Sequence, residues 1–148
     1  MIKLRLLLLT FLFSALSWGQ TLLPGDIAIV QFNSDGTDAM AFLALTDIPN
    51  GEVINFTDNG WIASGSFRTG EGTHIWTSPG VACGTVVTIT LSGPALSTTG
   101  DQILAYQGSA VSPTFITAIN FDSTGWSDAT SANTTALPLG LTDATNCV

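Results

Sequence analysis

The chain has 148 residues, of which 45% are hydrophobic and only 9% are charged. This composition argues against a disordered chain, and the length fits one domain. Eleven acidic residues against three basic ones give a formal charge of −8, a balance that disfavours nucleic acid and anionic lipid as partners.

The first segment of the chain has the three parts of a secretory signal peptide. Lys3 and Arg5 form a basic start, and an apolar run follows over residues 6–16. Small residues then precede a cleavage point before Gln20. The apolar run is too short for a transmembrane helix, which needs about 20 residues. We therefore expect residues 1–19 to be cleaved and the protein to be secreted or held at the outer cell surface, with no stable membrane insertion.

Removal of this segment makes the protein strongly acidic. Arg68 then stands alone against eleven carboxylates, one positive and eleven negative side chains with a net charge of −10. Without cations to displace the counterions of phosphate, the protein is not expected to bind nucleic acid. No cofactor is expected, but divalent cations are possible partners, because carboxylates are the oxygen ligands that Ca²⁺ prefers. The competing interpretation is that the acidic residues shape turns and keep the surface soluble.

Alternating apolar and β-branched residues predict strands from residue 26 onward, and no stretch has sustained helical periodicity. The first two predicted strands, residues 26–32 and 40–46, are joined through Asp35-Gly36, a hairpin signal because glycine accepts positive φ. A turn is predicted at residues 49–51. A third strand, residues 52–57, follows it.

Residues 61–72, which include Phe67 and Arg68, are rich in Gly and Ser, and we predict a long loop there. Strand patterns return at residues 74–77, 85–91, 102–106 and 114–120. About seven short strands with Gly- and Pro-rich turns, and no helix between them, predict an all-β fold. We expect an immunoglobulin-like, two-sheet antiparallel β-sandwich formed by residues 20–148 as a single domain.

The last segment, residues 121–148, is rich in Ser, Thr, Asp and Asn, with one apolar cluster at residues 137–141. It is predicted to be a loop, or a strand whose partner is missing. Residues 145–148 have the pattern of a strand that is just beginning, and we expect the reading frame to be truncated there.

Three stretches of the chain resemble a known module. They are residues 25–61 (GDIAIVQFNSDGTDAMAFLALTDIPNGEVINFTDNGW), 67–79 (FRTGEGTHIWTSP) and 96–108 (LSTTGDQILAYQG). They are similar to an N-terminal module of secreted cell-surface proteins of gliding and marine, Bacteroidetes-type bacteria, which itself resembles a divergent lamin-tail domain. The resemblance implies an immunoglobulin-like sandwich that serves as a noncatalytic accessory or adhesion module of a larger secreted protein, and it implies no active-site residues.

Cys83 and Cys147 are the two cysteines of the sequence. Export would place them in an oxidising space, where thiols pair, so we predict a disulfide between them. It would close a loop of roughly 64 residues, worth about 4 kcal/mol in the chain-entropy model. The alternative is two free thiols, since Cys147 lies next to the chain end, where chains fray.

Asn33, Asp35 and Asp38 place oxygen-bearing side chains around a glycine, as part of a cation-binding loop does, and Asp58 could join them from a neighbouring turn. These four residues are the candidate Ca²⁺ ligands. The EF-hand pattern is excluded because its acidic first ligand and its bidentate Glu are missing. Turn formation by the same side chains is the favoured interpretation.

Trp61, Phe67 and Trp126 lie among Gly, Ser and Asp in predicted loops, so we expect them to be exposed. Trp76 lies in a strand pattern and is expected to face inward. An exposed aromatic platform is a usual way for a β-sandwich to bind the flat face of a sugar. A carbohydrate-binding module is therefore the second candidate function, and burial of these rings in the core is the alternative.

A secreted hydrolase is the third candidate. A Ser-His-Asp triad would have to include His74, the single histidine, but no Gly-x-Ser-x-Gly elbow occurs. The neighbours of His74 predict a strand residue on the solvent face. Glycoside hydrolysis needs a carboxylate pair, yet nearly all acidic residues stand beside turn formers. No catalytic residue is assigned, and the favoured function is the noncatalytic module, with an extracellular polysaccharide or protein surface as its partner.

Overall fold

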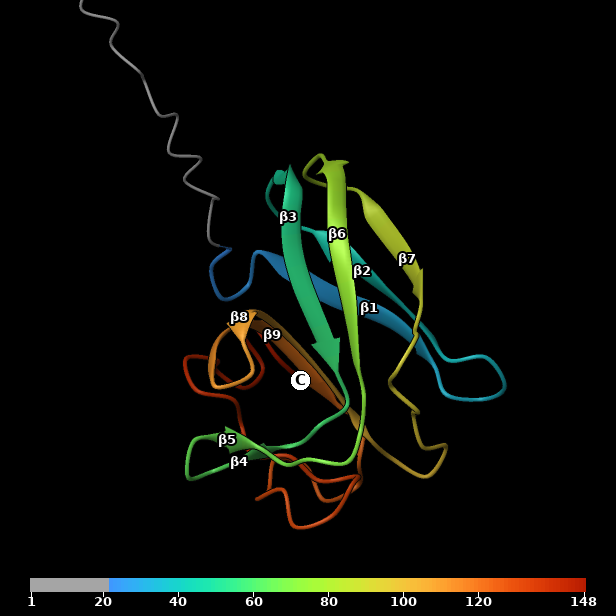
Figure 1. The fold of residues 1–148 in the computed structure, drawn as a ribbon, viewed down its shortest axis with the longest axis vertical. Coiled ribbons are helices and arrows are strands. Elements are labelled where there is room, and N and C mark those ends of the chain that lie inside the picture. The colour runs from blue at the N-terminus through green and yellow to red at the C-terminus, as the bar shows by residue number, and fades with distance from the viewer. Residues whose placement is uncertain (1–21) are drawn as a thin grey trace, which may run out of the picture.

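The computed structural model describes residues 22–148, which form two antiparallel sheets packed face to face (Figure 1). One sheet has the strand order β1-β2-β7 and the other β6-β3-β8-β9, while β4 and β5 pair separately. The all-β, two-sheet sandwich predicted from the sequence is confirmed. The strands are β1 (Ile27–Asn33), β2 (Ala39–Ala44), β3 (Ile48–Thr57), β4 (Trp61–Ile62), β5 (Ser66–Phe67), β6 (Thr73–Val81), β7 (Val86–Thr90), β8 (Gln102–Ser109) and β9 (Ser112–Asn120).

The predicted signal peptide, residues 1–19, lies outside the described residues. Within residues 22–148, no helix is long and apolar enough to span a membrane. The described chain starts at Leu22, whose side chain is buried in the main core and whose N–H donates to the side-chain oxygen of Gln107 in β8 at 2.7 Å.

The three-stranded sheet is centred on β2. β1 and β2 form a hairpin in which Ile27 pairs with Ala44, and its turn contains Gly36 at a φ of 85°, as the sequence predicted. β7 pairs with the other side of β2, where Leu43 lies opposite Val86.

The four-stranded sheet contains the longest strand, β3, between β6 and β8. Residues 49–51, predicted as a turn, lie inside β3 instead. The pairing with β6 shifts register between Asn50 and Val53, and Gly51 adopts a φ of 87°. The extra residue is therefore absorbed as a β-bulge, and the strand continues in the same direction.

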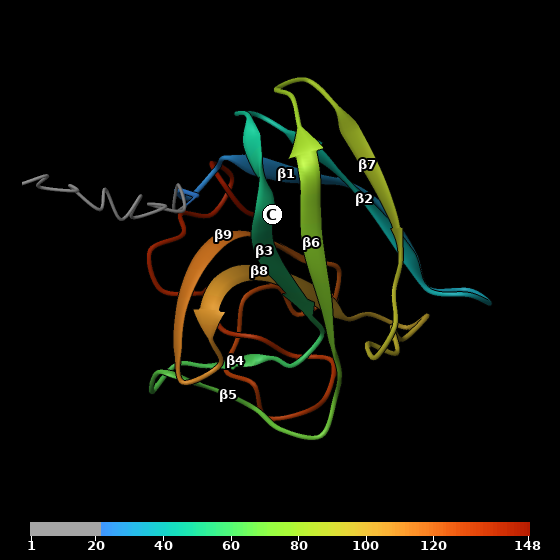
Figure 2. The same cartoon turned by 45° about the horizontal axis from the view of Figure 1, so that its top comes forward.

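The strand order is immunoglobulin-like. The hairpins β1–β2 and β8–β9 stay within one sheet, whereas the connections β2–β3, β6–β7 and β7–β8 cross between the sheets. Seven long strands thus divide into three and four, as in immunoglobulin sandwiches of this size. Figure 2 shows β1, β2 and β7 as one layer in front of which β3 and β6 run side by side.

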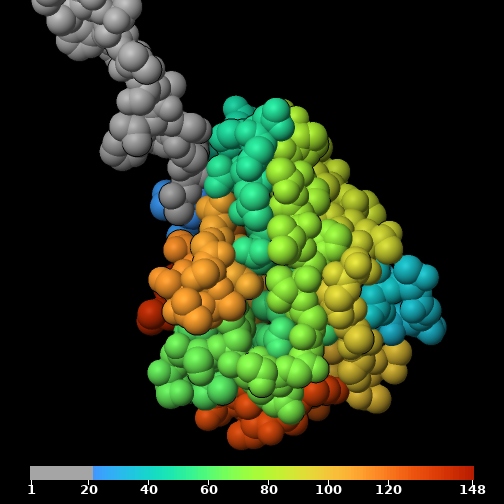
Figure 3. All heavy atoms as spheres, in the orientation of Figure 1, coloured from blue at the N-terminus to red at the C-terminus, as the bar shows by residue number. Residues whose placement is uncertain are grey.

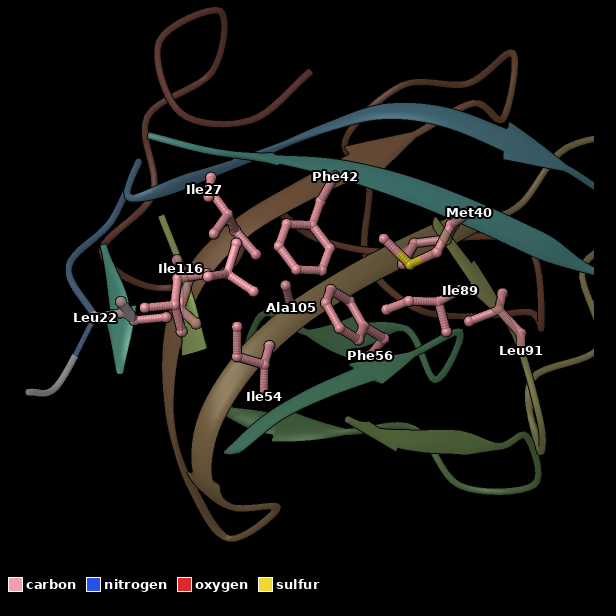
Figure 4. Close-up of a cluster of buried hydrophobic side chains, with 14 of the residues drawn as sticks. Leu22, Ile27, Met40, Phe42, Ile54, Phe56, Ile89, Leu91, Ala105 and Ile116 are labelled. Carbon is pink, nitrogen blue, oxygen red and sulfur yellow. The ribbon is translucent and has the colours of Figure 1, made fainter. Parts of the chain in front are cut away.

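The main core fills the space between the sheets (Figure 4). Strand alternation sends every second side chain inward, and Phe42 of β2 and Phe56 of β3 are completely buried there. Their rings stack with centroids 5.6 Å apart, and Trp76 of β6 meets Phe42 edge-on at 5.2 Å. Trp76 therefore faces inward, as predicted.

A second core lies on the outer face of the four-stranded sheet. In β8, Ile103 and Ala105 belong to the main core, while Leu104 and Tyr106 belong to this outer core, and all four are buried. The β4–β5 hairpin and the C-terminal segment supply the residues that cover the outward side chains. β8 is consequently buried on both faces.

Residues 121–148 form no named strand and run beneath the β4–β5 hairpin and along β9 (Figure 1). The N–H of Ala136 donates to the carbonyl of Trp61 at 2.8 Å. At the end of the segment, the N–H of Asn120 donates to the carbonyl of Val148 at 2.6 Å, and Cys147 forms a parallel bridge with Ala118. The strand-like pattern of residues 145–148 thus corresponds to a short pairing with β9.

Candidate functional site

The aromatic residues predicted to form an exposed platform do not form one. Trp61 is 5% exposed and meets the rings of Phe67 and Phe115 edge-on, with centroids 5.1 and 4.9 Å away. Trp126 is half-buried against the same outer core, and its Nε1 donates to the carboxylate of Asp143 at 2.9 Å. The expected exposure is wrong for both tryptophans because the outer face of β8 and β9 is apolar and the loops that carry them fold onto it.

Phe67 keeps part of its surface accessible. Its ring lies over Tyr106, with centroids 5.1 Å apart, and lines a cavity of about 240 Å³ on the outer side of the four-stranded sheet. Thr57, Arg68 and Glu71 also line this cavity. In Figure 3 the β4–β5 region (green) and the tip of the β8–β9 hairpin (orange) border this side of the sheet.

The polar floor of the cavity is held by hydrogen bonds. The hydroxyl of Thr57 donates to the carbonyl of Gly72 at 2.5 Å, and the hydroxyl of Thr73 donates to Thr57 at 3.0 Å. The side-chain amide of Asn59 donates to the same hydroxyl and the same carbonyl at 2.9 and 3.1 Å, and its oxygen accepts the N–H of Glu71 at 3.2 Å. The loop after β5 is therefore held in place by hydrogen bonds within the protein.

Arg68 and Glu71 form the charged part of the cavity. Nη1 of Arg68 lies 3.8 Å from Oε2 of Glu71, which is within the range of an ion pair but beyond a hydrogen bond. The Oε2 atom is buried and has no hydrogen-bond partner. Burial, aided by the charges of Asp58 and Asp101, raises the pKa of Glu71 to about 7, against the smaller opposing effect of Arg68.

Two buried aspartates beside Glu71 hold loops in place. The carboxylate of Asp58 accepts two backbone N–H donors at 2.8 and 2.7 Å, and that of Asp101 accepts two at 2.7 and 2.9 Å. Burial raises the pKa of Asp58 and raises that of Asp101 to about 6, although these N–H groups act in the opposite direction. Both carboxylates serve as acceptors for the framework.

Three of the four candidate Ca²⁺ ligands, Asn33, Asp38 and Asp58, are used in turns and loop contacts. The side-chain amide of Asn33 donates to two carbonyls of its own turn at 3.1 Å, and Asp35 is exposed at the tip of that hairpin. Asp38 accepts the N–H of Leu96 at 2.7 Å and lies near enough to Asp58 to raise its pKa. Across residues 22–148, no three His, Cys, Asp or Glu side chains are grouped as metal ligands.

His74 faces the interior, so its predicted position on the solvent face is wrong. It pairs with Phe56 across β3 and β6, and strand alternation puts it on the same face as Trp76. The side chain is half-buried, and its Nδ1 accepts the N–H of Ser92 at 3.1 Å. The inward direction of Trp76 decides that of His74, because residues two apart in a strand share a face.

The predicted disulfide is wrong, because Cys83 and Cys147 are unpaired. Cys83 is exposed in the connection between β6 and β7, whereas Cys147 is buried beside β9. β6 and β9 are the two opposite edges of the four-stranded sheet, so the sheet separates the two thiols. Burial raises the pKa of the Cys147 thiol to about 11.

Two other hollows differ from the cavity beside Phe67. One, of about 220 Å³, lies between β1 and residues 144–148 and is lined by no charged side chain. The other, of about 470 Å³, is lined by Glu52 and Gln107 beside the β8–β9 hairpin. Neither of these two brings an aromatic ring together with an ion pair.

No protein-family model matches the chain, and neither a curated protein nor a solved structure is significantly similar to it. The candidate site is therefore defined by the residues alone. Phe67 is a candidate ligand-binding residue from the sequence, whereas Arg68 and Glu71 have no predicted role there. One signal for them was available, since the only basic residue after the first nineteen stands three positions before a glutamate in the stretch FRTGEG.

Proposed function

We propose that the protein is a noncatalytic extracellular binding module, an accessory or adhesion domain of a larger secreted protein. The signal pattern of residues 1–19, the acidic composition and the resemblance to a lamin-tail-like module support this proposal. A β-sandwich suits the role because its sheet faces and end loops offer contact surfaces on a rigid frame.

The observation that carries the proposal is the use of His74, Asp58 and Asp101 in hydrogen bonds of the framework. Nδ1 of His74, the only histidine of the sequence, accepts a hydrogen bond from the N–H of Ser92. Each carboxylate oxygen of Asp58 and Asp101 accepts a backbone N–H. A general base must direct a lone pair at its substrate, whereas these atoms are directed into the fold.

The outer face of β3 and β6 offers a contact surface. Ile75 is 66% exposed and Val53 is 40% exposed, and Asn55, paired with Ile75, lies on the same face. Figure 3 shows this side of β3 and β6 uncovered. Contiguous apolar surface marks interaction sites, and Val53 and Ile75 lie on one uncovered sheet face.

A binding assay tests this proposal. The purified protein is expected to bind bacterial cell surfaces or insoluble polysaccharides, and the double variant Val53→Asp/Ile75→Asp is expected to bind more weakly. Leu45→Asp, at a residue that is 50% exposed and outside β3 and β6, is the matched control and should bind like the parent.

An activity assay tests the competing hydrolase. Panels of esters and glycosides should yield no product above background. Product release that disappears in a His74→Ala variant would overturn the noncatalytic assignment, because it would show a catalytic use of the histidine.

A further inference from the structure

We infer that the cavity beside Phe67 binds the end of a neutral saccharide chain, with Arg68 and Glu71 as its polar anchor. The inference rests on the proposed function and adds a ligand class to it. The site differs from the aromatic platform expected from the sequence, because Trp61 lies behind Phe67 in the outer core and the aromatic residues that line the cavity are Phe67 and Tyr106.

The first support is the unused hydrogen-bonding capacity of Glu71. Buried polar atoms in proteins nearly always have a partner, so an exception needs an explanation. Oε2 of Glu71 has none, and Nη1 of Arg68 is 3.8 Å away; because this oxygen is closed to solvent and the side chain is 13% exposed, Glu71 must turn toward the cavity before a ligand can use it. The side chain of Arg68 is 32% exposed, so part of it is accessible from solvent.

The two side chains together match a pair of adjacent hydroxyls. With its pKa raised to about 7, the Glu71 carboxyl is partly protonated at neutral pH and can accept or donate a hydrogen bond. A guanidinium only donates, whereas a hydroxyl does both. One sugar hydroxyl can donate to Glu71 while its neighbour accepts from Arg68. The planar guanidinium is suited to two parallel contacts of this kind.

The second support is the aromatic wall. The ring of Phe67 is held by contacts with Trp61, Tyr106 and Phe115 at centroid distances of 5.1, 5.1 and 5.7 Å. Its accessible part lines the cavity beside the polar pair. A fixed ring next to polar groups fits a sugar, which has apolar C–H faces and polar edges, and little ordering is needed on binding.

The charges around the cavity and the volume of the cavity indicate which saccharides it can bind. Arg68 is the only cation among residues 20–148, and the negative charges of Asp58 and Asp101 act on Glu71. These negative charges would repel an acidic sugar. The cavity of about 240 Å³ lies below the usual 300–1,000 Å³ of drug-sized sites, so it suits one terminal ring rather than a long chain.

Amide NMR titrations of the purified protein with methyl glycosides of neutral hexoses test the inference. The variants are Arg68→Gln and Glu71→Gln, and Asp35→Asn is the control, since it removes one carboxylate from the exposed β1–β2 turn. We expect saturable shifts confined to residues 67–73 and Tyr106. Each cavity variant should weaken glycoside binding about tenfold or more, because it loses one charge-assisted hydrogen bond. The control should bind like the parent.

Several outcomes overturn the inference. No shift with any glycoside, or unchanged affinity in both cavity variants with their dispersed spectra retained, would do so. If calcium chloride or glycine, and no glycoside, shifts the amide signals of the cavity, the ligand is not a saccharide. If the cell-surface binding described above persists while no glycoside binds, the ligand inference fails and the proposed function stands; if that surface binding is absent, the proposed function itself fails.

Discussion

The core between the sheets and the core on the outer face of β8 and β9 differ in composition and in origin. The main core consists largely of aliphatic side chains and phenylalanines that strand alternation sends inward from both sheets. The outer core gathers Trp61, Tyr106 and Phe115 with loop and C-terminal residues. Strand periodicity therefore predicts the first core, whereas the second depends on segments that have no regular pattern.

The candidate site lies at the edge of the outer core. The outer core fixes Phe67 from behind, and the loop that follows β5 sets Arg68 and Glu71 at its edge. The main core holds the sheet on which this assembly rests. The main core thus determines the fold, and the outer core determines the shape of the cavity.

Substitution of Phe42 by Ala should have the largest effect of the changes considered, because it removes a buried ring that packs on Phe56 and Trp76. We expect a loss of about 3–5 kcal/mol in the free energy of unfolding, measured by urea titration. Ile75→Ala, at an exposed apolar position, is the control and should change stability by no more than about 0.5 kcal/mol. Equal losses in the two variants would contradict the role of the main core.

Gly60→Ala should act on the outer core alone. A Cβ at Gly60 would lie 2.2 Å from the carbonyl oxygen of Thr134 and 3.0 Å from the Cβ of Ala129, so the C-terminal segment must move away. We expect a loss of about 1–3 kcal/mol. Amide exchange should rise in residues 121–148 and in β4–β5, while β2 keeps its protection. Uniform loss of protection in both sheets would mean that the two cores unfold as one.

Glu71→Gln should change how stability depends on pH. The carboxyl titrates near 4.5 in the unfolded chain and at about 7 in the folded protein, so the folded state binds more protons in this window. Stability therefore falls as the pH rises through the window, and the variant lacks this decline.

We expect Glu71→Gln to be more stable than the parent by about 1–2 kcal/mol near pH 8, after allowance for solvent screening, and equal to it near pH 4. Thermal melts across this range measure the difference. The parent and the variant keep a slope from Asp101, whose pKa burial raises to about 6. Parallel pH profiles for the two proteins would contradict the assignment of Glu71.

The two thiols should react at very different rates, with no change in stability. Cys83 is exposed, whereas Cys147 is 3% exposed in the outer core and has a pKa raised to about 11. A thiol reagent is expected to modify Cys83 rapidly and Cys147 only when the outer core opens. Mass spectrometry of the unreduced protein should find both thiols free, and a Cys83–Cys147 crosslink would show that the C-terminal segment can leave β9.

Much of the fold was predictable because it depends on local rules. Alternation located the seven long strands, and Asp35-Gly36 marked the first hairpin turn. The same rules misassigned residues 49–51, since a Pro-Asn-Gly stretch suits both a turn and a bulge and only pairing with β6 decides between them. His74 was misplaced although Trp76, two residues later, already indicated the face.

The candidate site was predictable only in part. Phe67 was selected as an aromatic in a loop, but Trp61 and Trp126 were selected with it for the same reason. Local sequence could not separate the three, because their exposure depends on a face of β8, a strand that is not a sequence neighbour of any of them. The nearness of Asp58 and Asp101 to Glu71 likewise arises from loops that meet only in the folded protein.

The sequence by itself determined the signal-peptide pattern, the acidic charge, the all-β class and the strands that form the main core. Charge follows from composition, and strands follow from period-two alternation among neighbouring residues. Tertiary structure alone decided that β8 is buried on both faces, that Cys83 and Cys147 lie at opposite edges of a sheet, and that Arg68 and Glu71 line a cavity beside Phe67. Each of these depends on contacts between segments far apart in the chain, and such contacts form when loops without a periodic pattern find apolar surface to cover.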